Sequence, residues 1–480
     1  MHSTERRFGQ AVVIGGSIAG LLTARVLSEH FAKVLILERD AAPESPASRK
    51  GIPQGRHVHL LLETGLKVMD TLFPGLKQEL RSAGAALIDA ARDTAWYHHG
   101  TWKPRYSSGI ETVLCTRPHL EWVVRQRVAA LPNVELRYDI SVEEPLADAE
   151  RTHITGVRLT GPGGEERLMA DLVVDASGRG SRTPRWLEAL GYGKPEVEEV
   201  GIDLAYTSRF YEPPAGEAFD WKLMIQYPRS PESWRSGVIM SVEGGRWIVS
   251  LTGYFGDHAP TDEQGFMDFV RSLPTRDIAT ALDGAVAMSP PVTHKIPKSQ
   301  WLHYERLPRF PEGFVVLGDA ACAFNPVFGQ GMTVAGQGAQ LLGACLAEQA
   351  RRSPGDLRGL SRRFQKKLAP LIHLPWFLAT TMDLHYPQTR GKRMPGLGVL
   401  HGILGTVLDM TSLNEQAYHQ LFQVLHLRCG PEALLKPRLL GSLVAYAIKS
   451  LHVPLSQRGN VNGPPAAPPQ PAAEALRRAS

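Results

Sequence analysis

A glycine-rich turn between an apolar strand and an apolar helix limits most strongly how this chain can fold. Residues 12–20 read VVIGGSIAG. β-Branched residues precede the turn, and apolar residues at helical spacing follow it. We therefore expect a strand over 10–15, a helix over 18–30 and a second strand over 33–38. In this β-turn-α-β unit, the N-terminus of the helix offers free N–H groups to a phosphate.

The residues of this turn have the types that dinucleotide binding requires. Gly15 permits the tight turn, and Gly20 lets the helix pack closely on the sheet. Ser17 replaces the second glycine of the usual pattern with a small side chain that can still donate a hydrogen bond. Glu38 ends the second strand and can accept hydrogen bonds from a ribose diol. Arg39 follows it and joins the candidate cofactor contacts. A plain βαβ unit with an incidental acid is the alternative.

The same residues also nearly match the G-x-S-x-G turn of serine hydrolases. That enzyme class needs downstream acid and histidine partners and an upstream loop that binds the oxyanion. The motif here begins on the first strand, which leaves no room for such a loop. A serine hydrolase is therefore the least favoured function.

A second glycine-rich segment follows an apolar strand expected over 314–317, and residues 318–332 read GDAACAFNPVFGQGM. It resembles the second FAD fingerprint of the p-hydroxybenzoate-hydroxylase-like flavoprotein monooxygenases. The resemblance implies that Asp319 binds the ribityl chain and that Pro326 lies beside the flavin ring. It also implies that the helix after Gly331 points its N-terminus at the pyrimidine end, where a helix dipole stabilises negative charge. Gly329 and Met332 complete this candidate set.

Other segments resemble the polyether-antibiotic epoxidase branch of this superfamily: RKGIPQGRHVH at 49–59, DASGRGSR at 175–182, AFNP at 323–326 and PWFLATT at 375–381. Arg117, before an expected helix, fits the family's arginine near the cofactor. Arg56 is a candidate contact for the FAD phosphates or the flavin edge.

The resemblance implies an FAD-dependent monooxygenase that inserts one oxygen atom from O2 into an apolar natural-product substrate. Epoxidation or hydroxylation would proceed through a C4a-hydroperoxyflavin. Such a transfer needs no protein nucleophile, so no catalytic side chain is assigned, and the protein's part is a dry, shaped pocket.

Two departures from family patterns leave alternatives open. Ser177-Gly178 stands where monooxygenases that bind NAD(P)H carry Asp-Gly. NAD(P)H can therefore deliver electrons directly or through a separate flavin reductase. Flavin halogenases carry Trp-x-Trp-x-Ile-Pro, whereas this chain has Arg246-Trp247-Ile248-Val249. A halogenase, and a flavin reductase or dehydrogenase acting on a lipid-like substrate, are the alternative functions.

The 480 residues allow two or three structural units. We expect an α/β fold: a discontinuous Rossmann-like FAD-binding domain, an inserted, mostly antiparallel β-sheet domain for substrate, and a C-terminal helical region. The predicted bounds are 1–90, 110–190 and 296–350 for the FAD domain, 91–109 and 191–295 for the sheet domain, and 351–453 for the helical region. Within these parts we expect a helix over 56–73 and a hairpin at Glu243-Gly244-Gly245-Arg246. We also expect a helix over 262–272 that opens with a capping box of Thr261 and Gln264. The tail 454–480 is rich in Pro, Ala and Gly, so it is expected to be disordered.

Composition excludes several other classes of function. The 53 basic and 48 acidic residues include no dense Lys/Arg block, which argues against nucleic acid binding. The four cysteines form no CxxC pair, so free thiols in a reducing cytoplasm are expected. His57 with His59, and His98 with His99, lack further ligands at a recognisable spacing, so no metal site is expected. The apolar runs 394–408 and 439–448 are shorter than the roughly 20 residues of a spanning helix, which predicts at most peripheral membrane contact.

Overall fold

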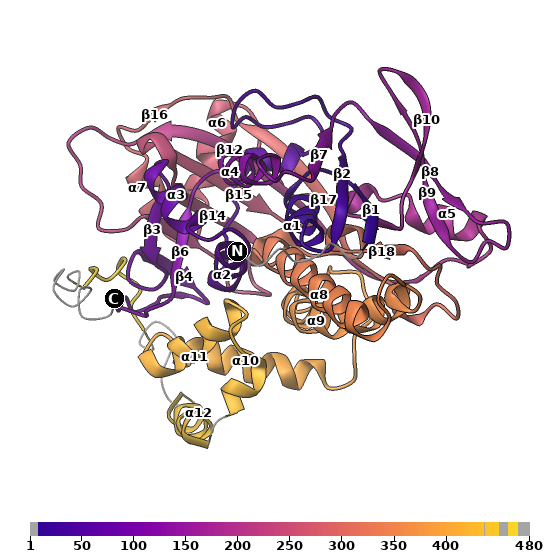
Figure 1. Ribbon diagram of the computed structural model, residues 1–480. Helices are drawn as coiled ribbons and strands as arrows, with labels where there is room; N and C mark the ends of the chain where they lie inside the picture. The colour runs from indigo at the N-terminus through magenta and orange to yellow at the C-terminus, as the bar shows by residue number, and fades with distance from the viewer. Residues whose placement is uncertain (1–7, 436, 451–458, 469–480) are drawn as a thin grey trace, which may run out of the picture. The chain divides into compact units, whose positions relative to one another are not determined.

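The computed structural model, drawn in Figure 1, describes residues 8–435, 437–450 and 459–468. These residues belong to two compact units. The first unit comprises Met1–Ala83, Cys115–Ala205 and His294–Met394. The second comprises Gly84–Leu114, Tyr206–Thr293 and Pro395–Ser480. The helices expected over 351–453 are therefore divided between the two units after Met394.

The first unit is built on a five-stranded parallel sheet with the order β18-β11-β1-β2-β7. Its strands are β1 (Phe8–Ile14), β2 (Phe31–Leu37), β7 (Val134–Arg137), β11 (Leu172–Asp175) and β18 (Phe314–Val316). The last residues of β1, β2, β11 and β18 are all buried, as expected for parallel strands covered on both faces. The glycine turn predicted from the sequence joins β1 to α1 (Ile18–Leu27), and β2 follows, so the β-turn-α-β prediction is confirmed.

Helices and a small antiparallel sheet complete the first unit. Its other helices are α2 (Glu63–Leu72), α3 (Leu76–Ser82), α4 (Arg117–Ala129), α5 (Thr183–Ala189), α8 (Gly331–Arg352) and α9 (Leu360–Asp383). The antiparallel sheet contains β8 (Ser141–Ala147), β9 (Ile154–Gly161) and β10 (Gly164–Met169). A short strand, β19 (Cys322–Ala323), pairs with β17 (Val292–His303). Helix α8 packs against α1, which brings the second glycine-rich segment to the first.

The second unit contains a mostly antiparallel sheet, as predicted. Its strands are β4 (Thr94–His98), β5 (Thr101–Trp102), β13 (Leu223–Gln226), β14 (Arg235–Ser241), β15 (Trp247–Gly253) and β16 (Val286–Ala287). β12 (Glu196–Glu212) and β17 each contain residues of both units. β14 and β15 form the hairpin expected from Glu243-Gly244-Gly245-Arg246, because the two glycines adopt positive φ angles of 75° and 69°. β3 (Ala86–Asp89) and β6 (Glu111–Leu114) form a separate pair.

The tryptophans of the second unit lie in two different environments. Trp102, Trp221 and Trp247 belong to one hydrophobic core with side chains of α6 (Glu263–Arg271) and α7 (Asp277–Ala281). Trp96 instead contacts the rings of Tyr418 and Phe422 on α11 (Glu415–Leu425). The alternation of side chains along β4 accounts for the difference, because Ala95 packs in the α6–α7 core and Trp96 points to the opposite face.

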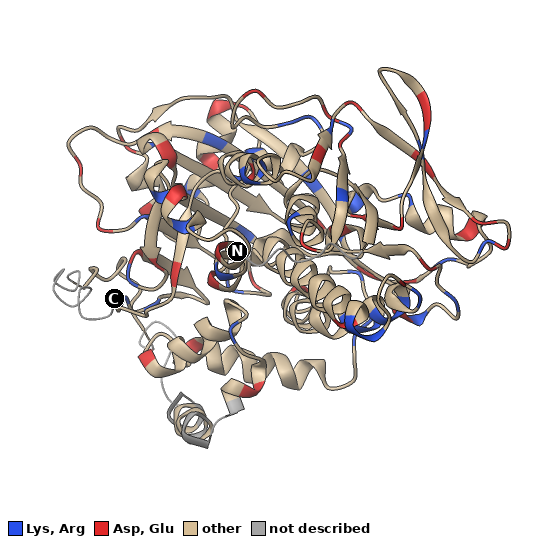
Figure 2. Cartoon of the chain, in the orientation of Figure 1, with Lys and Arg blue, Asp and Glu red and all other residues tan. Residues whose placement is uncertain are grey.

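Two further helices, α10 (Leu397–Met410) and α12 (Pro437–Ser450), accompany α11 near the C-terminus. Figure 2 shows α10 in tan along most of its length, because no Lys, Arg, Asp or Glu occurs from residue 394 to residue 408. Even so, none of the described helices combines the length and hydropathy needed to cross a membrane.

Two local predictions need correction. The sequence favoured a helix over 56–73, but Pro53–Arg56 forms a short 3-10 turn and α2 begins only at Glu63. Leu60 lies against the second glycine-rich segment, since a Cβ on Gly329 would be 3.3 Å from the Leu60 carbonyl oxygen, and this packing overrides local helix preference. The capping box proposed for Thr261 and Gln264 is also wrong: Asp262 caps α6 by accepting from the Gly265 N–H at 2.8 Å.

Part of the tail expected to be disordered is held in place. Residues 454–458 and 469–480 lie outside the described residues, whereas 459–468 are described. The Trp102 N–H donates to the Asn460 carbonyl at 2.8 Å, and the Ala467 N–H donates to Asp220 at 2.8 Å. Arg105 also donates to the Pro465 carbonyl at 3.1 Å, so this part of the tail is bonded to the second unit.

Candidate cofactor site

The first glycine turn has a geometry that only glycine permits at two positions. Gly15 has φ +102°, and a Cβ there would lie 2.7 Å from the Ala176 carbonyl oxygen. A Cβ on Gly20 would lie 1.8 Å from the Gly15 carbonyl oxygen. Ser17 is the N-cap of α1, and no side chain caps this N-terminus. The turn therefore presents the backbone N–H groups of the first helical turn, which can bind an anion.

Glu38 lies directly beside this turn. Its side chain is 7% exposed, and one carboxylate oxygen accepts from the Gly16 N–H at 3.0 Å. The other oxygen accepts from the Asp40 N–H at 3.1 Å. A carboxylate has about four acceptor positions, and Arg49 takes a third at 3.1 Å, so capacity remains for one hydroxyl of a ribose.

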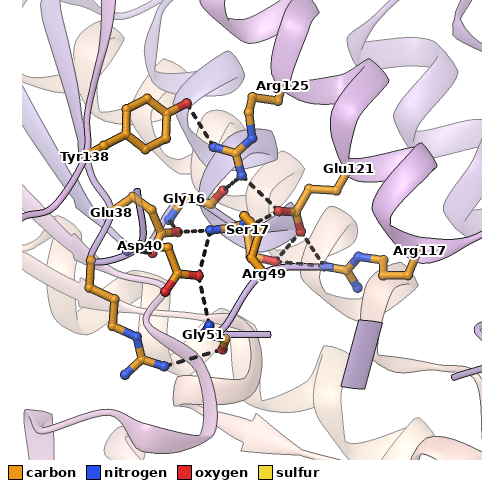
Figure 3. A network of polar contacts seen from close by, with 11 residues as sticks. Gly16, Ser17, Glu38, Asp40, Arg49, Gly51, Arg117, Glu121, Arg125 and Tyr138 are labelled. Carbon is orange, nitrogen blue, oxygen red and sulfur yellow. Dashed lines mark hydrogen bonds and ion pairs between the residues drawn. The ribbon is translucent and has the colours of Figure 1, made fainter. Parts of the chain in front are cut away.

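A buried network of charged side chains surrounds the turn, and Glu121 of α4 is at its centre (Figure 3). Arg49 and Arg125 donate to one oxygen of Glu121 at 2.5 and 2.8 Å. Arg117 and the Ser17 hydroxyl donate to the other at 3.2 and 2.7 Å. The network therefore ties the first glycine turn to α4.

Further bonds connect this network to the backbone of the turn and to the acids after β2. Arg125 donates to the Gly16 carbonyl at 2.5 Å. Arg49 also pairs with Glu38 at 3.1 Å and with Asp40 at 3.2 Å. The three arginines and three carboxylates balance in charge, which is the condition under which buried ions are tolerated.

The pKa values show how strongly these charges are coupled. Burial acts to raise the pKa of Glu121, but Arg117, Arg49, the Ser17 hydroxyl and Arg125 together lower it to about 2. Burial acts to lower the pKa of Arg49, but Glu121 and Glu38 outweigh this and raise it. Glu121 and Arg49 are therefore both ionised at neutral pH.

The sequence motifs do not single out Glu121, Arg125 or Arg49. The sequence does contain a signal for Glu121 and Arg125, because they follow Arg117 at i, i+4 spacing on one helix face. Arg49 gives no such signal, since it reaches Glu121 across 72 positions of sequence.

The second glycine-rich segment adjoins the first. Gly318 has φ +63°, and a Cβ there would lie 2.9 Å from the Ala19 Cβ. Asp319 follows in a 3-10 turn, and a Cβ on Gly331 at the start of α8 would lie 3.7 Å from an Asp319 oxygen. Met332 is buried in the first turn of α8, and no side chain caps the N-terminus of this helix. The fold thus unites the two segments that the sequence separates by about 300 positions.

The loop between Asp319 and α8 is held from two sides. Arg179 pairs with Asp319 at 3.5 Å and donates to the Phe324 carbonyl. Asn325 caps the turn Pro326–Phe328 by accepting from the Val327 N–H at 3.1 Å. Gly329 then adopts φ +65°, which turns the chain toward α8.

The remaining sequence candidates have other environments. Arg39 donates to the Gly51 carbonyl at 3.4 Å, and Arg56 is exposed at the end of its 3-10 turn. Arg39 therefore connects to the edge of the network in Figure 3, because the Gly51 N–H donates to Asp40 at 2.9 Å. Burial lowers the pKa of His57 to about 3 and that of His59 to about 4, so both imidazoles are neutral at pH 7.

The segment DASGRGSR forms a turn around Asp175. This fully buried carboxylate accepts from the hydroxyls of Ser177, Ser181 and Thr183 at 2.6, 2.5 and 2.5 Å. Ser177 thus stabilises the end of β11, close to Gly15.

Two buried polar atoms around the two segments fit an FAD molecule. Within the described part of the chain, no group pairs with Arg117 Nε or Gln330 Oε1. Buried polar atoms are normally hydrogen-bonded, so each of these atoms requires a partner. FAD carries phosphates, hydroxyls and ring carbonyl and N–H groups of the kind these atoms bind. The glycine turn, Glu38 and these atoms are therefore compatible with FAD.

Comparisons with known proteins agree with this geometry. Residues 9–358 match the family described as FAD binding domain. Protein Rv3254 of Mycobacterium tuberculosis is 34% identical over 404 residues, which cover 80% of this chain and 82% of that protein. Para-nitrophenol 4-monooxygenase of Pseudomonas sp. is 27% identical over 344 residues, covering 67% and 73% of the two chains.

Solved structures share the fold. The crystal structure of PqsL, a probable FAD-dependent monooxygenase from Pseudomonas aeruginosa, aligns with a TM-score of 0.60 at 18% identity. The alignment covers 79% of this chain and 97% of that one. The chain therefore belongs to the FAD binding domain family and is a flavin-dependent monooxygenase that uses FAD as its cofactor.

Proposed function

We propose that this protein inserts one oxygen atom from O2 into an apolar small molecule, by epoxidation or hydroxylation. The observation that carries the proposal is the contact between Gly318 and Ala19, which joins two FAD fingerprints into one site. Bound and reduced FAD supplies the chemistry that activates O2. The narrower likeness to polyether-antibiotic epoxidases stays a prediction, as does a natural product as substrate.

The residues of the first unit would hold the cofactor at its two ends. The N-terminus of α1 and Glu38 would bind the pyrophosphate and the adenosine ribose, and Asp319 would bind the ribityl hydroxyls. The N-terminus of α8 would face the pyrimidine ring, where its dipole favours negative charge. Pro326 and Gly329 would shape the loop against the ring.

The second unit offers an aromatic wall for an apolar substrate. The Trp96 and His98 rings stack at 4.9 Å, and Trp96 contacts the rings of Tyr418 and Phe422 at 5.9 and 5.7 Å. Burial lowers the pKa of His98 well below 6.5, so this ring is neutral. A neutral aromatic surface excludes water and favours an apolar ligand. We propose that substrate contacts this face at the half-buried His98, beside the rings that α11 covers, since the opposite face packs against α6 and α7.

The source of electrons is a second part of the proposal. Ser177 is occupied in the Asp175 turn and offers no carboxylate where related enzymes carry Asp-Gly. NAD(P)H is proposed as the electron donor, either directly or through a separate flavin reductase. Anaerobic mixing of the holoprotein with NADH and NADPH, with and without a flavin reductase, separates the two routes by the rate of flavin bleaching.

The central experiment supplies the FAD-loaded protein with 18O2 and a panel of apolar alkenes and phenols. One 18O atom in the product, with O2 consumed in proportion, supports the proposal. Product that forms without O2 would identify a reductase or dehydrogenase instead. Product that forms only when chloride or bromide is added would identify a halogenase.

A further inference from the structure

A buried carboxyl lies behind the second glycine-rich segment. Asp383 ends α9, is 1% exposed, and accepts from the Asn325 side-chain amide at 2.8 Å through Oδ1. Its backbone carbonyl accepts from the Thr389 hydroxyl at 2.6 Å, which fixes the end of the helix. The carboxyl therefore has a defined position relative to the loop.

The Asn325 side chain connects Asp383 to the loop that is expected beside the flavin. Its amide nitrogen is bound to Asp383, so its oxygen must face the other way. That oxygen accepts from the Val327 N–H and caps the turn Pro326–Phe328. Asn325 is fully buried, so an amide that lost Asp383 would have no water to replace it. The bonds to Asp383 and to the Val327 N–H thus agree in the direction they give the Asn325 amide.

The buried carboxyl of Asp383 lacks the partners that usually compensate such a group. Within the described part of the chain, Asp383 makes no ion pair, and its Oδ2 has no hydrogen-bond partner. Burial raises the pKa of Asp383 to about 7, although the Asn325 amide acts to lower it. Arg179, which holds the neighbouring Phe324 carbonyl, is bound instead to Asp319. A buried acid without a cation destabilises a protein, so its presence beside this loop indicates a function.

We propose that Asp383 is a positioning residue for the flavin: through Asn325 it orients the turn at Pro326 and thereby the loop that leads into α8. The proposal rests on the proposed placement of the flavin ring beside Pro326. Asp383 touches neither the cofactor nor the substrate in this scheme. It acts only by holding the amide of Asn325.

Three variants test the bond. Asp383→Ala removes the acceptor that Asp383 offers to the Asn325 amide, so we expect FAD affinity to fall about tenfold. Asp383→Asn keeps an acceptor oxygen at the same place and should restore affinity to within about twofold of the wild type. Asn325→Ser keeps an oxygen for the Val327 N–H but is too short to reach Asp383, so it should behave like Asp383→Ala.

The readouts are the dissociation constant of FAD from the reconstituted apoprotein and the visible absorption spectrum of the bound flavin. Gln349→Leu is the control. This 3% exposed glutamine bonds the Asp356 and Arg358 carbonyls at the far end of α8, about 27 Å along the helix from Gly331. It should lose stability without changing the flavin spectrum.

The outcomes separate the possible explanations. Weak FAD binding and an altered spectrum in Asp383→Ala and Asn325→Ser, reversed in Asp383→Asn, support the proposal. Tight binding with a wild-type spectrum in both disruptive variants would overturn it, and so would equal damage in Asp383→Asn or Gln349→Leu. If Asp383→Ala does not fold, the pair Asp383→Asn and Asn325→Ser decides in the same way. A wild-type protein that binds no FAD would instead refute the cofactor site itself.

Discussion

The two glycine-rich segments of the first unit are held in opposite ways. The first is surrounded by three arginines and three carboxylates that neutralise one another around Glu121. The second depends on an uncompensated buried acid, Asp383, and on the partly exposed Arg179. One segment is fixed by paired charge, and the other by a hydrogen bond to a single carboxyl.

This difference has a chemical consequence. A compensated network stays ionised over a wide pH range, because each charge stabilises the others. A lone buried carboxyl changes its protonation near neutrality, where its pKa has been raised. We therefore expect the pyrophosphate end of the site to be insensitive to pH, and the flavin end to be responsive.

The largest expected effect is the loss of the central carboxylate. Glu121→Gln leaves Arg117, Arg49 and Arg125 without their shared anion, and we expect the free energy of unfolding to fall by about 3–5 kcal/mol. Since the folded pKa of Glu121 is about 2 against 4.5 as its ordinary value, this stabilisation is complete above pH 4.5 and is lost as pH falls through 2. Urea titration at neutral pH measures the change.

A surface ion pair between α4 and α3 is the control for that variant. Arg127 of α4 pairs with Glu79, and both side chains are 38% exposed. Glu79→Gln should change stability by less than about 1 kcal/mol. If both variants lose the same stability, the buried network has no special role.

The next effect is a pH dependence caused by Asp383. Its pKa is raised from 3.8 to about 7 by burial, so the native state binds a proton that the unfolded chain has released. Stability should therefore decrease as pH rises from about 4 to about 7, by up to about 4 kcal/mol. Asp383→Asn should abolish this slope and be more stable than wild type at about pH 8. Parallel urea titrations that show identical slopes would exclude Asp383 as the cause.

A smaller effect is expected from Gly20→Ala. The new Cβ would lie 1.8 Å from the Gly15 carbonyl oxygen, so α1 must shift away from the turn. We expect a loss of about 3 kcal/mol and weaker FAD binding. Gly180→Ala is the matched control, because no atom lies within 4 Å of its Cβ position and the change should be neutral. Thermal denaturation and flavin fluorescence compare the two variants.

The smallest effect is expected from Ser17→Ala. The variant loses the bonds of the hydroxyl to Glu121 and Arg117, but these two residues remain paired at 3.2 Å. We expect a loss of about 1 kcal/mol. A loss as large as that of Glu121→Gln would mean that the hydroxyl, and not the paired charge, holds the first segment.

Local sequence signals predicted the elements that local interactions decide. The β-turn-α-β unit and the Gly244–Gly245 hairpin follow from periodicity and from residues that tolerate positive φ. The start of α2 was misplaced because Leu60 lies against the Gly329 loop, and that contact joins residues about 270 positions apart in the sequence. The N-cap of α6 is Asp262, one residue after the predicted Thr261. Side-chain type alone does not locate a helix end to within one residue.

The candidate site was predicted only in part for the same reason. The glycines, Glu38 and Asp319 are found from the motifs themselves. Asp383 lies 58 positions from Asn325, within a helix whose sequence gives no sign that one acid is buried. Residues distant in the sequence bury the Asp383 carboxyl and thereby raise its pKa, and only the folded structure shows this burial.

The C-terminal segment 459–468 has a practical consequence for handling this protein. The Asn460 carbonyl pairs with the Trp102 N–H at the edge of β5, which is the last strand of its sheet. An uncovered edge strand invites pairing with a neighbouring molecule and can start aggregation. A truncation ending at Ser450 would expose this edge, so expression vectors should retain the segment and carry affinity tags at the N-terminus.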